Sequence, residues 1–285
     1  MLIADWAQVQ RGLHRERCAG VLPGTNLFAR RDEVESWIAK GHLAEAAFSG
    51  ATLFLRSDDG FRRVYHAAAD PAALAAALST LPTDGALVAD LVGRPADVEP
   101  WVAAYAEAGF VERRALLRMA RQGGATPMRA EDAVASGAVA WAQPEEARAV
   151  RGLLERLLDP HTEPLPTVDA LHDAAVAGGL IVARRDEDLV GMLWFERQGV
   201  VAHLRYWHLE PTGRGFGLGG QMMRRFLAAS GDAGRLVLWV VADNDESIAI
   251  YRHYGFLADG LVDRIMVRPG IDQPLPPLHE PSRSL

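Results

Sequence analysis

Arg214-Gly215-Phe216-Gly217-Leu218-Gly219-Gly220 is the most informative stretch of this sequence. Glycine has no Cβ atom, so it lets the backbone adopt turns that other residues avoid and approach a ligand closely. The following residues, 221–227, are predicted to form a helix. The free N–H groups and the positive end of the helix dipole would then converge on the glycine turn. We therefore predict a site for a phosphate or pyrophosphate group here.

Two known kinds of phosphate loop fit this stretch poorly. A P-loop needs a Lys followed by Ser or Thr, and none follows here. The dinucleotide fingerprint Gly-x-Gly-x-x-Gly does match from Gly215 onward, and Asp243 ends the next predicted strand, 236–242. Asp243 lies beyond the usual spacing of about 20 residues, however. Residues 210–213 also separate the loop from the preceding strand, 200–209. A dinucleotide-binding oxidoreductase is therefore kept only as an alternative.

A third interpretation uses the residues on both sides of the loop. Arg214-x-x-Gly217-x-Gly219 resembles the Arg/Gln-x-x-Gly-x-Gly/Ala motif of the GNAT superfamily of acyl-CoA N-acyltransferases. Asn244-x-x-Ser247-x-x-x-Tyr251-x-x-x-Gly255-Phe256 resembles that family's Asn-x-x-Ala-x-x-x-Tyr-x-x-x-Gly-Phe segment, with Ser in place of the commoner Ala. Leu209-Glu210-Pro211 is similar to the Val-x-Pro that ends its fourth strand. The resemblance covers roughly residues 128–268.

The resemblance implies both a fold and an activity. The fold would be α/β, a mixed, mostly antiparallel sheet flanked by helices. The activity would be transfer of an acyl group, most simply acetyl, from CoA to a primary amine of a small molecule by direct attack. Acetyl-CoA would be the co-substrate, and no metal is expected. A non-catalytic, CoA-binding regulatory module is an alternative from a different class.

The resemblance also implies the cofactor contacts. The loop would donate N–H groups to the CoA pyrophosphate, and the end of strand 200–209 would hold the pantetheine arm. That strand would diverge from the next one, so that a backbone N–H polarises the thioester carbonyl. Asn244 would bind pantetheine or cap the end of a strand. The implied contacts are Trp207, His208, Leu209, Arg214, Gly215, Phe216, Gly217, Leu218, Gly219, Gly220, Asn244, Ser247 and Tyr251.

Acyl transfer to an amine also needs an acid and a base. Tyr251 matches the family's general acid, and a phenol with a reference pKa of about 10 keeps its proton at neutral pH; the alternative is an aromatic ring that only packs. His203 falls where many relatives carry a Glu that acts as the general base and takes the amine proton. Imidazole can also accept a proton near neutrality. His208 is a second candidate, which simple alternation places on the opposite face of the strand. Either His can equally be a hydrogen-bonded structural residue.

The segment 159–167 joins two predicted helices, 145–158 and 168–177. In the family this segment lines the acceptor pocket. Its polar residues Asp159, His161 and Glu163 are therefore candidates to bind a cationic amine. The alternative is a surface loop stiffened by its prolines.

Composition excludes several classes of partner. The 285 residues are 49% hydrophobic with a net charge of −7, enough apolar material for two domains. The sequence has no stripe of basic residues of the kind that binds nucleic acid. It also has no apolar stretch of about 20 residues, the length needed to cross a membrane. Cys18 is the only cysteine, so no disulfide or cysteine-based metal site forms within the chain. We expect a cytoplasmic protein.

We interpret the first half of the sequence as a faint copy of the second. The alternative is that Tyr-x-x-x-Gly-Phe recurs by chance at the end of an ordinary helix. Tyr105-x-x-x-Gly109-Phe110 echoes the motif at Tyr251, and a hairpin predicted at 51–67 echoes one at 180–195. The glycine loop has no counterpart there. We therefore predict a degenerate GNAT-like domain without a CoA loop at 1–124, a linker at 121–127, a catalytic domain at 125–268 and an irregular, Pro-rich tail at 269–285. Apolar surface of the first domain would be covered by the second domain or by another subunit of a homodimer.

Overall fold

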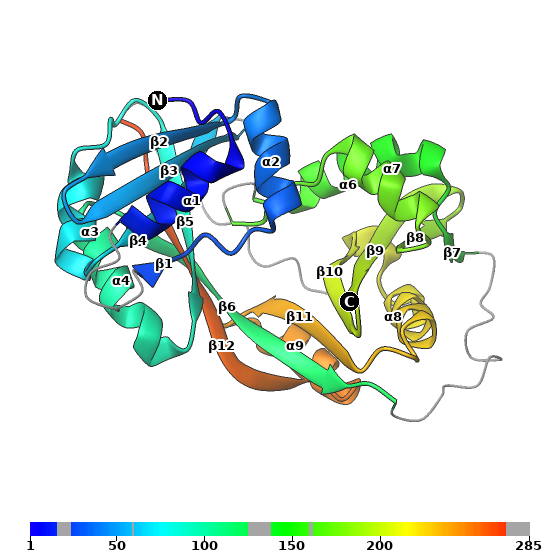
Figure 1. Ribbon diagram of the computed structural model, residues 1–285. Coiled ribbons are helices and arrows are strands. Elements are labelled where there is room, and N and C mark those ends of the chain that lie inside the picture. The colour runs from blue at the N-terminus through cyan, green and yellow to red at the C-terminus, as the bar shows by residue number, and fades with distance from the viewer. Residues whose placement is uncertain (16–23, 59, 125–137, 160–161, 272–285) are drawn as a thin grey trace. The chain divides into compact units, whose positions relative to one another are not determined.

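The computed structural model describes residues 1–15, 24–58, 60–124, 138–159 and 162–271. These residues form two compact units (Figure 1). Within the described part, unit 1 consists of residues 1–115 and 261–271, and unit 2 consists of residues 116–260. Most of the tail predicted at 269–285 lies outside the described residues.

Unit 1 is a sheet with helices on both faces. Its strand order is β2-β3-β4-β5-β12. α1 and α2 pack on one face against Phe54 and Tyr65, and α3 and α4 pack on the other face against Leu53 and Val64, as the alternation of side chains along a strand requires. Its elements are α1 (Trp6–Arg15), β1 (Gly24–Thr25), α2 (Arg31–Ala39), β2 (Leu43–Phe48), β3 (Ala51–Asp58), β4 (Phe61–Ala68), α3 (Pro71–Ser79), β5 (Ala86–Gly93), α4 (Pro95–Glu107) and parts of β6 (Val111–Gln122) and β12 (Leu257–Arg268).

Unit 2 has the same three layers. Its strand order is β6-β11-β10-β9-β8-β7. α6 and α7 pack against Met192 and Trp194, whereas α8 and α9 pack on the other face against Leu193 and Phe195. Its further elements are β7 (Val139–Trp141), η1 (Pro144–Glu146), α6 (Ala147–Leu157), α7 (Val168–Val176), β8 (Leu180–Arg185), β9 (Asp188–Gln198), β10 (Val201–Leu209), η2 (Pro211–Gly213), α8 (Leu218–Ala229), β11 (Arg235–Val241) and α9 (Asp245–His253). The predicted fold class, α/β with mostly antiparallel sheets flanked by helices, is confirmed.

Each unit takes one strand from the other half of the sequence. Residues 116–122 of β6 pair with β11 in unit 2, and residues 262–268 of β12 pair with β5 in unit 1. The compact units therefore differ from the predicted limits at 124 and 125. Arg121 and Gln122, predicted as part of a linker, belong to β6 instead, because their backbone pairs with Leu236 and Arg235 of β11.

The exchange predicts the behaviour of a fragment. Fragment 125–285 lacks β6, so one edge of β11 has no partner strand. The exposed N–H and C=O groups of that edge can pair with another chain and cause aggregation. It also carries β12 without β5. We expect the fragment to be insoluble or to melt without a cooperative transition, whereas the full chain melts cooperatively. Size-exclusion chromatography and thermal circular dichroism measure this. A soluble fragment that melts within about 3 °C of the full chain would contradict it.

The units repeat one order of elements. Strand, helix, parallel strand, helix and strand occur as β4-α3-β5-α4-β6 and as β10-α8-β11-α9-β12. The predicted match of the 51–67 hairpin with the 180–195 hairpin is wrong by one strand. β4 and β10 correspond, because each is followed by a helix and then by its parallel neighbour. The hairpin β3–β4 therefore corresponds to β9–β10, and β2, which we did not predict, corresponds to β8.

Candidate active site

β10 and β11 diverge at the centre of unit 2. Both strands are described throughout, and their parallel pairing ends at Leu204 and Leu238. Beyond that point β10 stays paired with β9 as far as Leu209, and β11 stays paired with β6 as far as Val241. The second half of β10 therefore separates from β11. This is the divergence that the family resemblance implied.

A bulge in β10 decides which side chains share a face. The strand shifts register between Leu204 and Tyr206. The side chains in the core beside α8 and α9 change from even to odd positions across this shift: Ala202, Leu204, Trp207 and Leu209. His203 and His208 therefore lie on the same face, the one opposite α8 and α9. The prediction from simple alternation is wrong here, because one extra residue in a bulge reverses the alternation.

Both histidines are kept neutral. Burial lowers the pKa of His208 to about 4, and its ring centroid lies 6.1 Å from that of Tyr206. His203 is half-buried, and its pKa is lowered by burial and by the positive charges of Arg205 and Arg118. A neutral imidazole can accept a proton, but a lowered pKa makes it a weaker base. The assignment of His203 as the base stays a prediction.

The glycine loop has the backbone geometry that only glycine adopts readily. Gly215 has φ +82° and Gly217 has φ +70°, and a Cβ atom added at either position would meet nothing within 4 Å. Gly217 is the N-cap of α8, which begins at Leu218 rather than at the predicted Gln221. Gly219 and Gly220 therefore form the first helical turn. Its N–H groups have no partner within the helix.

A cavity of ≈ 380 Å³ lies at this helix start. Its lining residues are Leu209, Arg214, Gly215, Gly217, Leu218, Gly219, Gly220, Ile250, His253 and Tyr254. α8 has no side-chain cap and no acid in its first turn. The guanidinium of Arg224 comes within 3.3 Å of the Cβ position of Gly220. Free N–H groups, the helix dipole and a nearby cation together favour an anion in the cavity.

Residues that were not predicted also contact the glycine loop. Arg185 of β8 donates from Nη1 to the carbonyl of Thr212 at 2.8 Å, and its guanidinium lies 4.2 Å from the ring centroid of Phe216. These contacts hold the loop on both sides of Arg214. Phe216 itself does not line the cavity. Ile250, His253 and Tyr254 also line the cavity and were not predicted, although a spacing of three and four residues is typical of one face of a helix.

α9 carries Tyr251 into the core beside the diverging strands. Its ring centroid lies 5.5 Å from that of Trp207. Burial and the nearby charge of Glu163 raise the pKa of Tyr251 above its ordinary value, so the phenol keeps its proton. Asn244 is the N-cap of α9, and its Oδ1 accepts a hydrogen bond from Ser247 N at 3.0 Å. Asn244 therefore caps the start of a helix, and not the end of a strand as the alternative prediction had it.

Three of the predicted cofactor contacts hold buried polar atoms without a hydrogen-bond partner among the described residues. They are Trp207 Nε1, Arg214 Nε and Ser247 Oγ. A buried polar group without a partner costs about 1–3 kcal/mol. A ligand bound beside such a group can supply the missing hydrogen-bond partner. Their position on β10, the loop and α9 fits a ligand that runs from the cavity toward the diverging strands.

The predicted acceptor segment is tied to the rest of unit 2. Asp159 is buried, and its carbonyl accepts hydrogen bonds from Thr162 N and Glu163 N at 3.0 and 2.8 Å. The hydroxyl of Tyr206 donates to the carbonyl of Pro164. This arrangement brings Glu163 close enough to Tyr251 for its charge to affect the phenol. His161 lies outside the described residues.

The described residues contain neither a cluster of side chains that could hold a metal ion nor a membrane-spanning helix. No group of three or more His, Cys, Asp or Glu side chains that could hold a metal ion occurs in the part of the chain that the structure describes. Within that same part, every helix is too short or too polar to cross a membrane.

The sequence is similar to a known family, and the fold is similar to those of known proteins. Residues 147–256 match the family model of the acetyltransferase (GNAT) family. No curated protein matches the sequence. The fold resembles a GCN5-related N-acetyltransferase from Sphaerobacter thermophilus, at 12% identity and a TM-score of 0.56 over 93% of both chains. It also resembles one from Kribbella flavida, at 19% identity and a TM-score of 0.53 over 84% of this chain and 95% of that one.

A third similar structure is a tandem GNAT protein from the clavulanic acid biosynthesis pathway. It is 16% identical, with a TM-score of 0.53 over 79% of this chain and 80% of that one. At these identities the likeness concerns the fold, and two units in one chain agree with it. The family match covers α6 to α9, the elements that build the glycine loop and carry Tyr251. Residues 147–256 of this chain are therefore a domain of the GNAT acetyltransferase family.

Proposed function

We propose that unit 2 transfers an acetyl group from acetyl-CoA to the primary amine of a small molecule. The observation that carries this proposal is the cavity at the uncapped start of α8, next to the divergence of β10 from β11. An acyl-CoA needs both features, because its pyrophosphate is an anion and its pantetheine arm is a narrow, amide-containing chain. Acetyl-CoA would supply the acyl group as an activated thioester.

The residues around the cavity have different roles in this reaction. Arg214 and the glycine turn bind the pyrophosphate through backbone N–H groups. The second half of β10, from Trp207 to Leu209, offers its backbone to the pantetheine arm. Tyr251 holds a proton that the departing thiolate can take. The amine attacks the carbonyl directly, so no acyl group is carried by the protein.

The acceptor is proposed to be a cationic amine. Glu163 is half-buried and lies close to Tyr251, so its carboxylate attracts an ammonium group toward the reacting centre. Tyr206 stacks on Trp194, with ring centroids 5.6 Å apart, and its hydroxyl anchors the segment that carries Glu163. An aromatic pair beside a carboxylate suits a small amine with an apolar part.

The test is a binding and turnover experiment on the full chain. Isothermal titration calorimetry with CoA, NAD⁺ and NADP⁺ should detect CoA alone. A panel of small amines with acetyl-, propionyl- and succinyl-CoA should then show release of free thiol, fastest with acetyl-CoA and a cationic amine. CoA binding without turnover on any amine would favour the regulatory module. Binding of NAD(P)⁺ without CoA would overturn the proposal.

A further inference from the structure

Unit 1 contains the same divergence of strands as unit 2. Parallel pairing of β4 with β5 ends at Arg63 and Val88, while β4 stays paired with β3 as far as Ala68. β5 meanwhile stays paired with β12 as far as Gly93. The second half of β4 therefore separates from β5, as β10 separates from β11.

The aromatic residues beside the two divergences also correspond. Tyr105 of α4 lies 5.8 Å from the ring of His66 on β4, as Tyr251 lies 5.5 Å from Trp207 on β10. Each tyrosine also meets the Phe of its own Gly-Phe pair edge-on: Phe110 in unit 1 and Phe256 in unit 2. The gap between β4 and β5 is therefore the counterpart of the proposed acyl-CoA gap.

In unit 1 the chain itself fills this gap. β1 pairs antiparallel with Ala67 and Ala68 of β4. The next residue, Asn26, is buried, and its Nδ2 donates to the carbonyls of Val64 on β4 and Asp90 on β5, both at 3.1 Å. Its Oδ1 accepts from His66 N at 2.7 Å. One side chain thus bridges the two strands and satisfies backbone groups that the divergence would leave without partners.

The other parts of a cofactor site in unit 1 are also occupied. Asp70 caps α3 by accepting from Ala73 N at 2.8 Å, and Pro71 at the first helical position has no N–H. That helix start therefore repels a phosphate. The hydroxyl of Tyr105 lies 3.2 Å from Nδ1 of His66. Both side chains are buried, and burial lowers the pKa of His66 to about 3.

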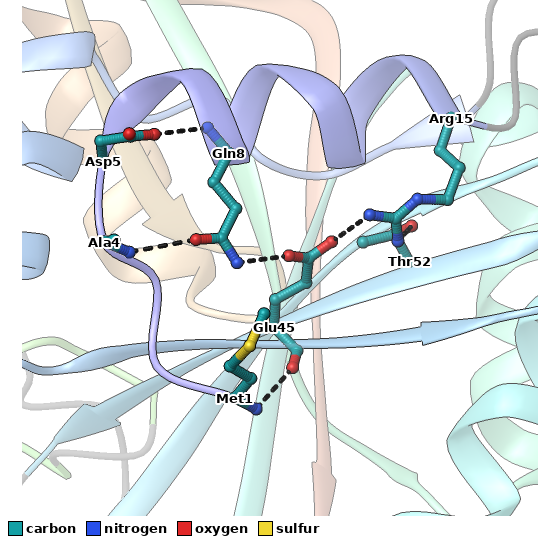
Figure 2. Close-up of polar contacts among 7 residues, drawn as sticks. All are labelled: Met1, Ala4, Asp5, Gln8, Arg15, Glu45 and Thr52. Carbon is teal, nitrogen blue, oxygen red and sulfur yellow. Dashed lines mark hydrogen bonds and ion pairs between the residues drawn. The ribbon is translucent and has the colours of Figure 1, made fainter.

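Contacts of α1 and of Gly24 help to hold the filling segment in place. Before it, α1 is fastened to the sheet through the buried Glu45, whose carboxylate accepts hydrogen bonds from Gln8 at 2.8 Å and Arg15 at 2.7 Å (Figure 2). Gly24 lies against Trp101, so that a Cβ atom there would come within 2.0 Å of the indole ring. A larger residue at this position would therefore require Trp101 or the segment to shift.

We propose that residues 24–26 are a built-in ligand of unit 1, bound in the gap between β4 and β5 that corresponds to the acyl-CoA gap of unit 2. This rests on the proposed function only for the identity of the missing cofactor. A tethered segment binds at a high effective concentration, so a free cofactor competes poorly with it. Unit 1 therefore keeps the fold of a transferase without a cofactor site, and the chain binds one acyl-CoA.

Hydrogen exchange of the full chain tests this proposal. In the wild type the amide of His66 should be protected, because it donates to Asn26. Asn26→Ala removes that acceptor, and Gly24→Ala pushes the segment against Trp101. We expect each variant to exchange at His66 at least about tenfold faster. Gly85→Ala is the matched control, because a Cβ atom there meets nothing within 4 Å, and it should leave the rate unchanged.

The outcomes are distinguishable from those of the proposed function. Unchanged protection at His66 in a folded Asn26→Ala variant would overturn the built-in ligand. If Gly24→Ala does not fold, Asn26→Ala alone decides. Calorimetry with acetyl-CoA should give one site per chain in the wild type and in Asn26→Ala, and a second site in the wild type would overturn the proposal. Absence of CoA binding would instead contradict the function of unit 2 and leave the exchange result standing.

Discussion

Replacement of Tyr251 by Phe is expected to lower kcat by about 10²–10⁴-fold with little change in affinity for CoA. The substitution removes only the hydroxyl, while the ring keeps its contacts with Trp207 and Phe256. A general acid contributes a factor of this size when it delivers a proton in the transition state. The thiolate would otherwise have to leave as an anion in a buried site, where charge is poorly solvated.

The matched control is Tyr105→Phe in unit 1. Tyr105 occupies the same place in the repeated Tyr-x-x-x-Gly-Phe motif, but it contacts His66 beside the filled gap. Removal of the Tyr105 hydroxyl should lower the melting temperature by a few degrees, because one buried hydrogen bond is lost. It should leave kcat unchanged. Steady-state kinetics with thiol detection measure both variants. A fall in kcat of less than about threefold for Tyr251→Phe, with chemistry rate-limiting, would exclude Tyr251 as the acid.

The pKa of Tyr251 adds a pH dependence. Burial and the charge of Glu163 raise this pKa, so the protonated phenol persists to higher pH than a free tyrosine. Deprotonation of Tyr251 should therefore not reduce kcat below about pH 10, the ordinary pKa of the group. A loss of kcat between pH 8 and 9 that disappears in Tyr251→Phe would contradict this.

Replacement of Gly217 by Glu is expected to weaken CoA binding by at least about 100-fold, or about 2.7 kcal/mol. The new carboxylate would stand in the cavity at the start of α8. Two negative charges about 4 Å apart repel by about 4 kcal/mol at an effective dielectric constant of about 20. The fold should survive, because a Cβ atom at this position meets nothing within 4 Å.

Gly199→Glu is the control for strain and charge. Gly199 also has a positive φ, +58°, and open space around its Cβ position, but it lies in the turn between β9 and β10. Both variants pay a similar cost for a side chain in the left-handed region. Calorimetry should therefore show lost CoA binding in Gly217→Glu and wild-type binding in Gly199→Glu. Equal affinities in the two variants would contradict the assignment of the cavity.

Local patterns in the sequence predicted the parts of the site that depend on neighbouring residues. The glycine turn forms because Gly215 and Gly217 reach positive φ without strain, and the acidic turn at Asp186 and Glu187 also adopts positive φ between two strands. Strand 200–209 and strand 236–242 were each predicted to within one residue. The cavity residues Ile250, His253 and Tyr254 are spaced by three and four residues, which is also a local pattern, typical of one face of a helix.

Local patterns of this kind were sufficient to predict the fold class, the glycine turn before α8 and the repeat of Tyr105 and Tyr251. Three features required the folded structure: the bulge that places His203 and His208 on one face, the exchange of β6 and β12, and the occupation of the gap between β4 and β5 by Asn26. Turns and helix starts depend on torsion angles and on residues a few positions away. Strand partners and gap-filling side chains depend on contacts between segments far apart in the chain, where many pairings have similar local propensity and packing selects one.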